Sequence, residues 1–408
     1  MLTSLPDDIL HEIVEQLRYA VSESDYPLAE ENDVETFLKS GWTSYSSTRF
    51  HLSSLSTTCW RLRPIAERIL YREIHVDNVG WIALSERGWH NGKLQAHPAG
   101  SLSLLARTVQ ERPALASLIR SVDLRWCDGS GKGARQQVQE LIRSCDRVTR
   151  VAVSEIDEEL LDILEPVKLG IHSFSALCAS RNVERIISCF PHLRDLHLFL
   201  HGVRSPVRTP ILTHSIRRMR FNLHVLGERF GGTCQSVLAL AGSSVEELIV
   251  ENGVHVRGQP YPPLPLLEAP IYGQLRSLSV KDVDLFEPIT YPSIFTSMPS
   301  LQHLHIMRCR ILPPGALLGV PASIVSMSFS LYGAGEPDLF LCSLAHCIRL
   351  CISSRRCLAG IRVETRRSKD YPGNLIPLRD LCIADDVGFE EVSDNNSHTS
   401  PKVTVFFF

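Results

Sequence analysis

The sequence predicts an α/β protein in which a small helical N-terminal domain precedes a solenoid of parallel strands alternating with helices. Two observations indicate this fold class. A short apolar pattern recurs along most of the 408 residues, with helical stretches between its copies. Ahead of the first copy, two segments space their apolar residues as helices do rather than as strands do.

The first helical segment is SLPDDILHEIVEQL, residues 4–17. Ser4 can cap the helix and Pro6 is tolerated in the first turn, where an N–H has no helical partner. Ile9 and Ile13 lie four residues apart, with Leu5 and Leu10 beside them, so one side of the helix is apolar. An apolar side of this kind packs either on its own domain or on another protein.

The second helical segment is LSSLSTTCWRLRPIAERILYREIHV, residues 52–76. Leu55, Cys59, Leu62 and Ile65 recur at helical spacing, and the end of the segment, from Tyr71 onward, predicts the first strand. Residues 18–51 between the two helical segments include an acidic stretch, which we expect to be a solvated loop, with a partner-contacting insertion as the alternative.

The body of the chain repeats the pattern Leu-x-x-Leu-x-Leu with conservative replacements. It is clearest in FPHLRDLHLFL (190–200) and MPSLQHLHIMRCRI (298–311). The copies start roughly 20 to 45 residues apart, and the longest gap leaves room for a degenerate copy near Ile171 and Phe174. The matching triplets are Ile119/Val122/Leu124, Val148/Val151/Val153, Leu193/Leu196/Leu198, Ile216/Met219/Phe221, Val245/Leu248/Val250, Leu275/Leu278/Val280, Leu301/Leu304/Ile306, Ile324/Met327/Phe329, Leu358/Ile361/Val363 and Leu378/Leu381/Ile383.

Stacking follows from this pattern, because one amphipathic strand with one helix cannot bury its apolar side alone. The pattern and its spacing are those of an irregular leucine-rich-repeat solenoid, with an ordinary α/β domain as the alternative. We therefore expect a helical domain at 1–76, with its insertion at about 18–51, and a solenoid at 77–385. A disordered tail is expected at 386–408, ending in the strand-like KVTVFFF.

Composition excludes several classes of function. The chain is 44% hydrophobic and 21% charged, with a net charge of −3, so neither nucleic acid nor a membrane surface is indicated as a partner. We expect no signal peptide and no apolar run long enough to span a bilayer, hence a cytoplasmic or nuclear location. The twelve cysteines are then expected to be reduced thiols, many of them buried.

Catalytic motifs are not complete. In DLRWCDGSGKGARQQ, Trp126 and Gly133 stand where a phosphate-binding loop needs Gly and Ser or Thr. Cys342, Cys347, Cys351 and Cys357 cluster with His346 but form no CxxC pair, so buried thiols are expected there and zinc is the alternative. We therefore expect no enzyme, no cofactor and no metal, and an activity around the cysteine cluster ranks third among the functions considered.

A binding surface can be read from the repeat. Residues flanking the second Leu of each copy point away from the core, because side chains alternate along a strand, and in a solenoid they would line a concave face. The side chains predicted to bind there are Asp195, His197, Phe199, Arg218, Arg220, Glu247, Glu251, His303 and His305. A solvated surface with ion pairs between strands is the alternative.

The two N-terminal segments together resemble an F-box, and with the repeats the chain resembles the fungal-type F-box/leucine-rich-repeat substrate receptors of Skp–cullin–F-box ubiquitin ligases. The resemblance rests on the Leu-Pro start, the Ile-Leu-x-x-Ile helix and the Cys-to-Arg-Pro-Ile-Ala segment that ends in Leu-Tyr-Arg. Leu62 stands where the family usually has Trp, and residues 18–51 are longer than the usual connection.

That resemblance implies docking on a Skp-type adaptor, and through it on a cullin, with an unknown protein substrate held by the repeats. The adaptor would be bound by Leu5, Pro6, Ile9, Leu10, Ile13, Leu55, Cys59, Leu62 and Ile65. A leucine-rich-repeat interaction scaffold outside any ligase, whose N-terminal helices only cap the solenoid, is the alternative.

Overall fold

The chain forms two compact units, Met1–Cys178 with Arg185–Leu193, and Ala179–Glu184 with Arg194–Phe408. The computed structural model describes residues 6, 8–14, 54–57, 60–77, 100–125, 132–153, 156, 158–179, 182–201, 216–224, 234, 237–238, 244–252, 270–283, 295–307, 319–330, 344–346, 348–349, 358–365, 376–384 and 387–393.

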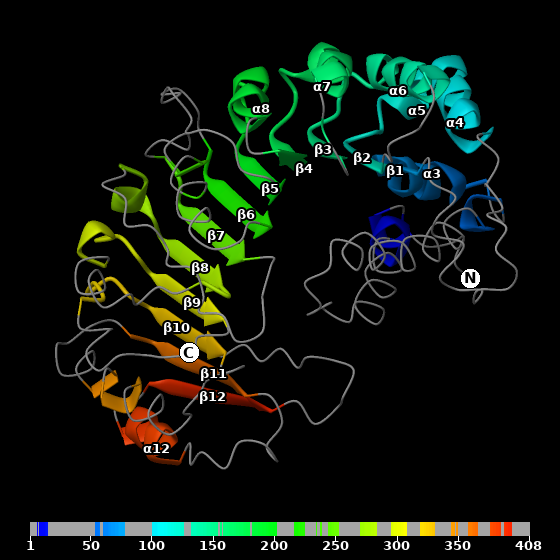
Figure 1. Ribbon diagram of the computed structural model, residues 1–408. Coiled ribbons are helices and arrows are strands. Elements are labelled where there is room, and N and C mark those ends of the chain that lie inside the picture. Colours follow the sequence, from blue (N-terminus) through cyan, green and yellow to red (C-terminus); the bar gives the residue numbers. More distant parts are fainter. Residues whose placement is uncertain are drawn as a thin grey trace, which may run out of the picture. The chain divides into compact units, whose positions relative to one another are not determined.

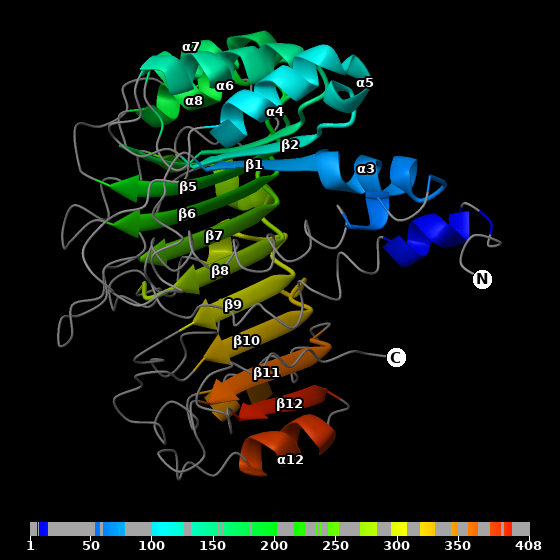
Figure 2. The same ribbon diagram turned by 90° about the vertical axis from the view of Figure 1, so that its right-hand side faces the viewer.

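The first unit contains a parallel sheet with the helices α4 to α8 on one side of it, while α3 leads into the first strand from its end (Figures 1 and 2). Each strand pairs with the next along the chain, and α4 and α6 lie side by side. The strands are β1 (Glu73–Asp77), β2 (Ser121–Arg125), β3 (Arg150–Val153) and β4 (Ser173–Ala179). The helices are α3 (Arg63–Arg72), α4 (Gly100–Glu111), α5 (Pro113–Ala116), α6 (Lys132–Ser144), α7 (Glu158–Leu164), η3 (Glu165–Val167) and α8 (Val183–Cys189).

In the second unit, strands β5 to β12 pair in parallel, again each with its successor in the chain. They are β5 (Asp195–His201), β6 (Arg218–His224), β7 (Glu247–Asn252), β8 (Ser277–Lys281), β9 (His303–Met307), β10 (Ser326–Ser330), β11 (Gly360–Thr365) and β12 (Gly388–Ser393). Short helices η5 (Pro270–Gln274), η6 (Phe295–Ser297) and α12 (Ile376–Ala384) connect some of them. The predicted α/β architecture with a long parallel sheet is confirmed.

The register of the second unit aligns the predicted apolar triplets from strand to strand. The second positions form one row, Leu196, Met219, Leu248, Leu278, Leu304 and Met327, and the third positions form another, Leu198, Phe221, Val250, Val280, Ile306 and Phe329. Every side chain in both rows is buried. Burying a side chain of this size stabilises the fold by about 1.5–3 kcal/mol, so the two rows are the core that holds the sheet.

A repeated backbone contact fixes this register at the start of each strand. The carbonyl of Arg194 accepts hydrogen bonds from the N–H groups of both Arg217 and Arg218, at 2.8 and 3.0 Å. The carbonyls of Arg217, Glu246, Arg276, Gln302 and Val325 each accept two N–H groups from the following strand in the same way, as do those of Arg120 and Thr149 in the first unit. The first residues of neighbouring strands are therefore aligned across the sheet, although the connections between the strands differ in length.

Two parts of the sequence-based fold differ from the structure. The segment of the Leu378/Leu381/Ile383 triplet is the helix α12 and not a strand. The spacing of three between Leu378 and Leu381 also suits a helix, and this helix buries Cys382 and exposes Ile383. The last strand is instead β12, which begins at Gly388 within the segment predicted to be a disordered tail, because backbone pairing with β11 supports a polar strand there.

The N-terminal segments pack on one another within the first unit. Residues 8–14 are helical, and the N–H of Leu10 donates to the carbonyl of Pro6 at 3.0 Å. Val14 and Ile69 form a small core, against which Leu55, Ile65 and Leu70 pack. The predicted first strand is β1, although Tyr71 belongs to the end of α3.

Candidate interaction surfaces

The N-terminal helix divides its apolar residues between two sides. Leu10 and Val14 are 1% and 2% exposed, whereas Ile9 and Ile13 are 45% and 37% exposed. Pro6 is also exposed, three residues before Ile9 and therefore on the same side of the helix. One apolar side thus packs inside the chain, and the other leaves two isoleucines in contact with solvent.

Trp60 is the most exposed large apolar side chain of this region, at 86%. It lies in the turn that precedes α3, three residues before the helix begins. The set of residues predicted to bind an adaptor does not include Trp60, because its neighbours Cys59 and Leu62 match the expected helical spacing and Trp60 does not. In the sequence, Trp60 is a large aromatic residue that does not fit the helical spacing of the apolar residues around it. That mismatch is the signal that could have identified it as an exposed side chain.

The other residues predicted to bind the adaptor differ in accessibility. Leu62 is buried, and Leu55 and Ile65 are half-buried against the core of Val14 and Ile69. Leu10 is buried as well, so of this predicted set Pro6, Ile9 and Ile13 are the side chains that solvent reaches most readily. Leu5 and Cys59 lie outside the described residues.

In the second unit, the side chains opposite the core rows form a surface that we call the polar face of β5–β10. It comprises Asp195 and His197 on β5, Arg218, Arg220 and Asn222 on β6, Glu247, Ile249 and Glu251 on β7, Ser277, Ser279 and Lys281 on β8, His303, His305 and Met307 on β9, and Ser326 and Ser328 on β10. The in-register pairing puts His197 and His305 on the same side of the sheet, as the repeat pattern predicts.

Ion pairs neutralise the arginines of this face. Arg218 donates from Nε and Nη2 to the two carboxylate oxygens of Asp195, at 2.6 and 2.8 Å, and this contact raises the pKa of the arginine. Arg220 Nη2 donates to Glu251 Oε1 at 2.9 Å, and Asn222 Nδ2 donates to the other oxygen of Glu251 at 3.2 Å. The Glu251 side chain is buried, so these two hydrogen bonds offset the cost of removing its carboxylate from water.

Phe199 does not offer the exposed apolar contact that its place in the pattern suggests. It is 8% exposed and its ring contacts that of His197, with the centroids 4.6 Å apart. The alternation of side chains along β5 correctly predicted the side of the sheet on which Phe199 lies. It does not predict which other side chains pack over Phe199 on that side. Phe199 therefore stabilises the unit more than it serves as an anchor for a partner.

The part of the polar face on β8 to β10 has a different chemistry. His303 and His305 are half-buried on β9, with Ser277 and Ser279 in register on β8 and Ser326 and Ser328 in register on β10. The Nδ1 atom of His303 lies 2.8 Å from the hydroxyl oxygen of Ser326. Hydroxyls and imidazoles predominate here, in contrast to the paired charges on β5 to β7.

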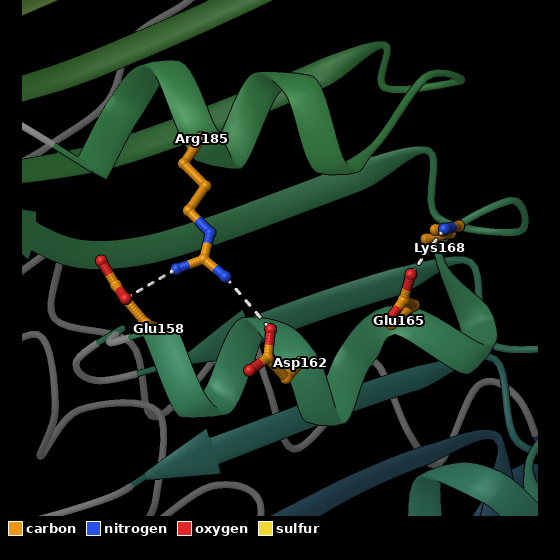
Figure 3. A network of polar contacts seen from close by, with 5 residues as sticks. All are labelled: Glu158, Asp162, Glu165, Lys168 and Arg185. Carbon is orange, nitrogen blue, oxygen red and sulfur yellow. Dashed lines mark hydrogen bonds and ion pairs between the residues drawn. The ribbon is translucent and has the colours of Figure 1, made fainter.

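The helices of the first unit are connected by a further set of ion pairs (Figure 3). Arg185 of α8 donates to Glu158 and Asp162 of α7, at 3.2 and 3.1 Å, and Arg135 of α6 pairs with Glu159. These partners neutralise much of the acidic surface of α7. Because the pairs are exposed, each contributes about 0–1 kcal/mol, and we interpret them as contacts that align neighbouring helices.

Four of the five cysteines that the structure describes behave as core residues, and the fifth, Cys189, is half-buried. Cys145, Cys178, Cys234 and Cys382 are buried free thiols. Burial raises the pKa of both Cys145 and Cys178 to about 12, which keeps these thiols protonated and unreactive near neutral pH. The Cys342, Cys347, Cys351 and Cys357 cluster lies outside the described residues, so the zinc alternative stays a prediction.

Within the described part of the chain, no helix is long and apolar enough to cross a membrane, and no group of three or more His, Cys, Asp and Glu side chains is arranged to hold a metal ion. Neither a family model nor a curated protein matches the sequence. The fold and the surfaces themselves define the class: an α/β protein of stacked parallel strands with an exposed apolar helix side and a polar sheet face.

Proposed function

We propose that this protein is the substrate-recognition subunit of an Skp–cullin–F-box ubiquitin ligase. Its N-terminal helices would bind a Skp-type adaptor, and the polar face of a leucine-rich-repeat solenoid would hold a protein substrate. The observation that carries the proposal is the pair of solvent-exposed isoleucines, Ile9 and Ile13, on a helix whose opposite side is already packed.

Docking through this helix follows the physics of helix-in-groove recognition. A partner groove that buries Ile9 and Ile13 removes apolar surface from water, and the two residues lie one turn apart on the same side. The buried side, Leu10 and Val14, would hold the helix in place while the exposed side binds. In this arrangement Leu10 acts indirectly, as a support for Ile9 and Ile13.

The repeats suit the second task, because they present one continuous surface built from successive strands. A receptor of this class carries out no chemistry. It raises the local concentration of its substrate near a ubiquitin-charged enzyme, so binding geometry alone produces the effect. The ligase assembly also accounts for the expected location in the cytoplasm or nucleus and for the expectation that this chain is no enzyme.

The test is a pull-down with a purified Skp-type adaptor, comparing wild type with Ile9→Asp/Ile13→Asp. A carboxylate at a desolvated apolar contact costs several kcal/mol, so adaptor binding should be lost. Leu169→Asp and Ile383→Asp introduce the same charge at exposed apolar positions elsewhere and should bind normally. Undiminished adaptor binding by the double mutant, with an unchanged circular dichroism spectrum, would refute the proposal.

A second candidate is a repeat scaffold outside any ligase, whose N-terminal helices serve only to cap the core. It is favoured by the burial of Leu10 and Val14 and by the contact of Val14 with Ile69. The two candidates differ in the behaviour of wild-type protein, since a scaffold would not retain the adaptor at all. They also differ in the double mutant, which loses a partner in the first case and loses nothing measurable in the second.

A further inference from the structure

We infer that His303 and His305 form a two-histidine chelate for a divalent transition-metal ion of the zinc class on the polar face of β5–β10. The sequence predicts no metal, and the zinc alternative concerns the cysteines between residues 342 and 357. The inference rests on three features of β9 and its neighbours.

The first feature is the spacing of the histidines on a strand. The burial pattern of β9 alternates, so that Leu304 and Ile306 lie in the core and His303 and His305 project from the same side. Two residues apart on a parallel strand, their Cα atoms are separated by roughly 6.6 Å. Imidazoles on adjacent same-face positions can direct two ring nitrogens toward one ion at about 2.0–2.1 Å each.

The second feature is the contact between His303 and Ser326. When Nδ1–H donates to the serine oxygen 2.8 Å away, the lone pair needed for metal binding lies on Nε2 of the same ring. Metal-binding histidines usually have such a partner on the second nitrogen, because it fixes the tautomer and the ring orientation. Ser326 would thus position His303 without touching the ion.

The third feature is the size and charge of the neighbours. Ser277, Ser279, Ser326 and Ser328 flank the two histidines in register, and their small side chains carry no charge. Lys281 is the nearest cation along β8 and is paired in register with Met307, one position beyond His305 on this side of the sheet. With two protein ligands, the remaining coordination positions would be filled by water or by a bound partner.

The experiment must report on these two histidines individually, because the chain contains 16 histidines and 12 cysteines. Diethyl pyrocarbonate modifies imidazoles, and peptide mapping by mass spectrometry locates the modification. Adding Zn²⁺ to the intact chain should slow the modification of His303 and His305 together, and a chelator should restore it. His192, which is exposed and lies outside the polar face of β5–β10, is the reference and should be unaffected.

Variants distinguish a chelate from separate weak contacts. His305→Gln should abolish Zn²⁺ protection of His303, and Ser326→Ala should raise the Zn²⁺ concentration needed for half-protection by about tenfold, as the loss of an outer-shell partner typically does. His197→Gln and Lys281→Ala should leave protection in place. Undiminished protection of His303 in His305→Gln, or equal protection of the exposed His192 in wild type, would overturn the inference.

Discussion

Arg218 and Asp195 face each other across β5 and β6 and are joined by two parallel hydrogen bonds, at 2.6 and 2.8 Å. The arginine is therefore already engaged within the chain, although it belongs to the predicted substrate-binding face. A partner that uses Arg218 must either displace Asp195 or bind the pair as a unit. Because the pair is exposed, it adds only about 0–1 kcal/mol to stability.

Arg220→Ala should destabilise the protein more than Arg218→Ala does. Arg220 is hydrogen bonded to the buried Glu251, whose carboxylate would be left with Asn222 alone. An under-satisfied buried charge costs about 1–3 kcal/mol or more, whereas loss of the exposed Arg218 pair costs under about 1 kcal/mol. Urea unfolding of the two variants measures the difference. Equal losses would mean that Glu251 is solvated in solution.

Leu304→Ala should lower the free energy of unfolding by about 2–5 kcal/mol, and His305→Ala should change it by less than about 0.5 kcal/mol. The two residues are neighbours on β9, but Leu304 is fully buried in the core row and His305 belongs to the polar face. Leu196→Ala, in the same row on β5, should behave like Leu304→Ala. A His305→Ala variant as unstable as Leu304→Ala would contradict the assignment of faces.

Trp60→Ala should weaken binding of the Skp-type adaptor without changing thermal stability. The indole is almost fully exposed, so its removal leaves no cavity, yet exposed tryptophans are frequent anchors of protein interfaces. We expect a loss of at least about tenfold in affinity, equivalent to about 1.4 kcal/mol, measured by titration calorimetry. The exposed Leu169→Ala is the control, and an affinity equal to wild type would exclude Trp60 from the interface.

Native protein at pH 8 should leave Cys145 and Cys178 unlabelled by a thiol reagent, while unfolded protein reacts at both. Burial raises the pKa of each to about 12 in the folded chain, against about 8.5 for a solvated thiol. Above about pH 8.5 the unfolded state releases these protons first, so the stability contribution is lost as pH rises towards 12. Cys145→Ala/Cys178→Ala should flatten the decline in urea midpoint between pH 7.5 and 9.5, and an identical decline would refute it.

The sequence predicted the sheet well because its apolar triplets have a physical requirement behind them. Leu196, Phe221 and Ile306 must face one core, and the two-residue period of a strand leaves few other arrangements. The same reasoning failed at Leu378 and Leu381, because the spacing of three that begins each repeat also occurs on one side of a helix.

The interaction surfaces were less predictable, because accessibility depends on what packs above a residue. Leu10 and Ile9 are adjacent and equally apolar, but one is buried and the other is exposed. Phe199 was assigned to the correct side of the sheet and is nevertheless covered. Ion pairs between strands were an alternative from the sequence, but that Arg220 binds Glu251, 31 residues away, follows only from the side-chain positions in the folded sheet.

The repeated carbonyl contact at the strand starts has a consequence for the folding route. In the described residues of each unit, every strand pairing joins strands that follow one another in the chain. The carbonyl before one strand binds the first N–H groups of the next, which aligns the two strands. Folding can then begin at any adjacent pair and spread by addition of single strands, without closing a long loop first. Removing β11 and β12 from the C-terminal end should shorten the array by two layers and leave the order of β5 to β10 intact.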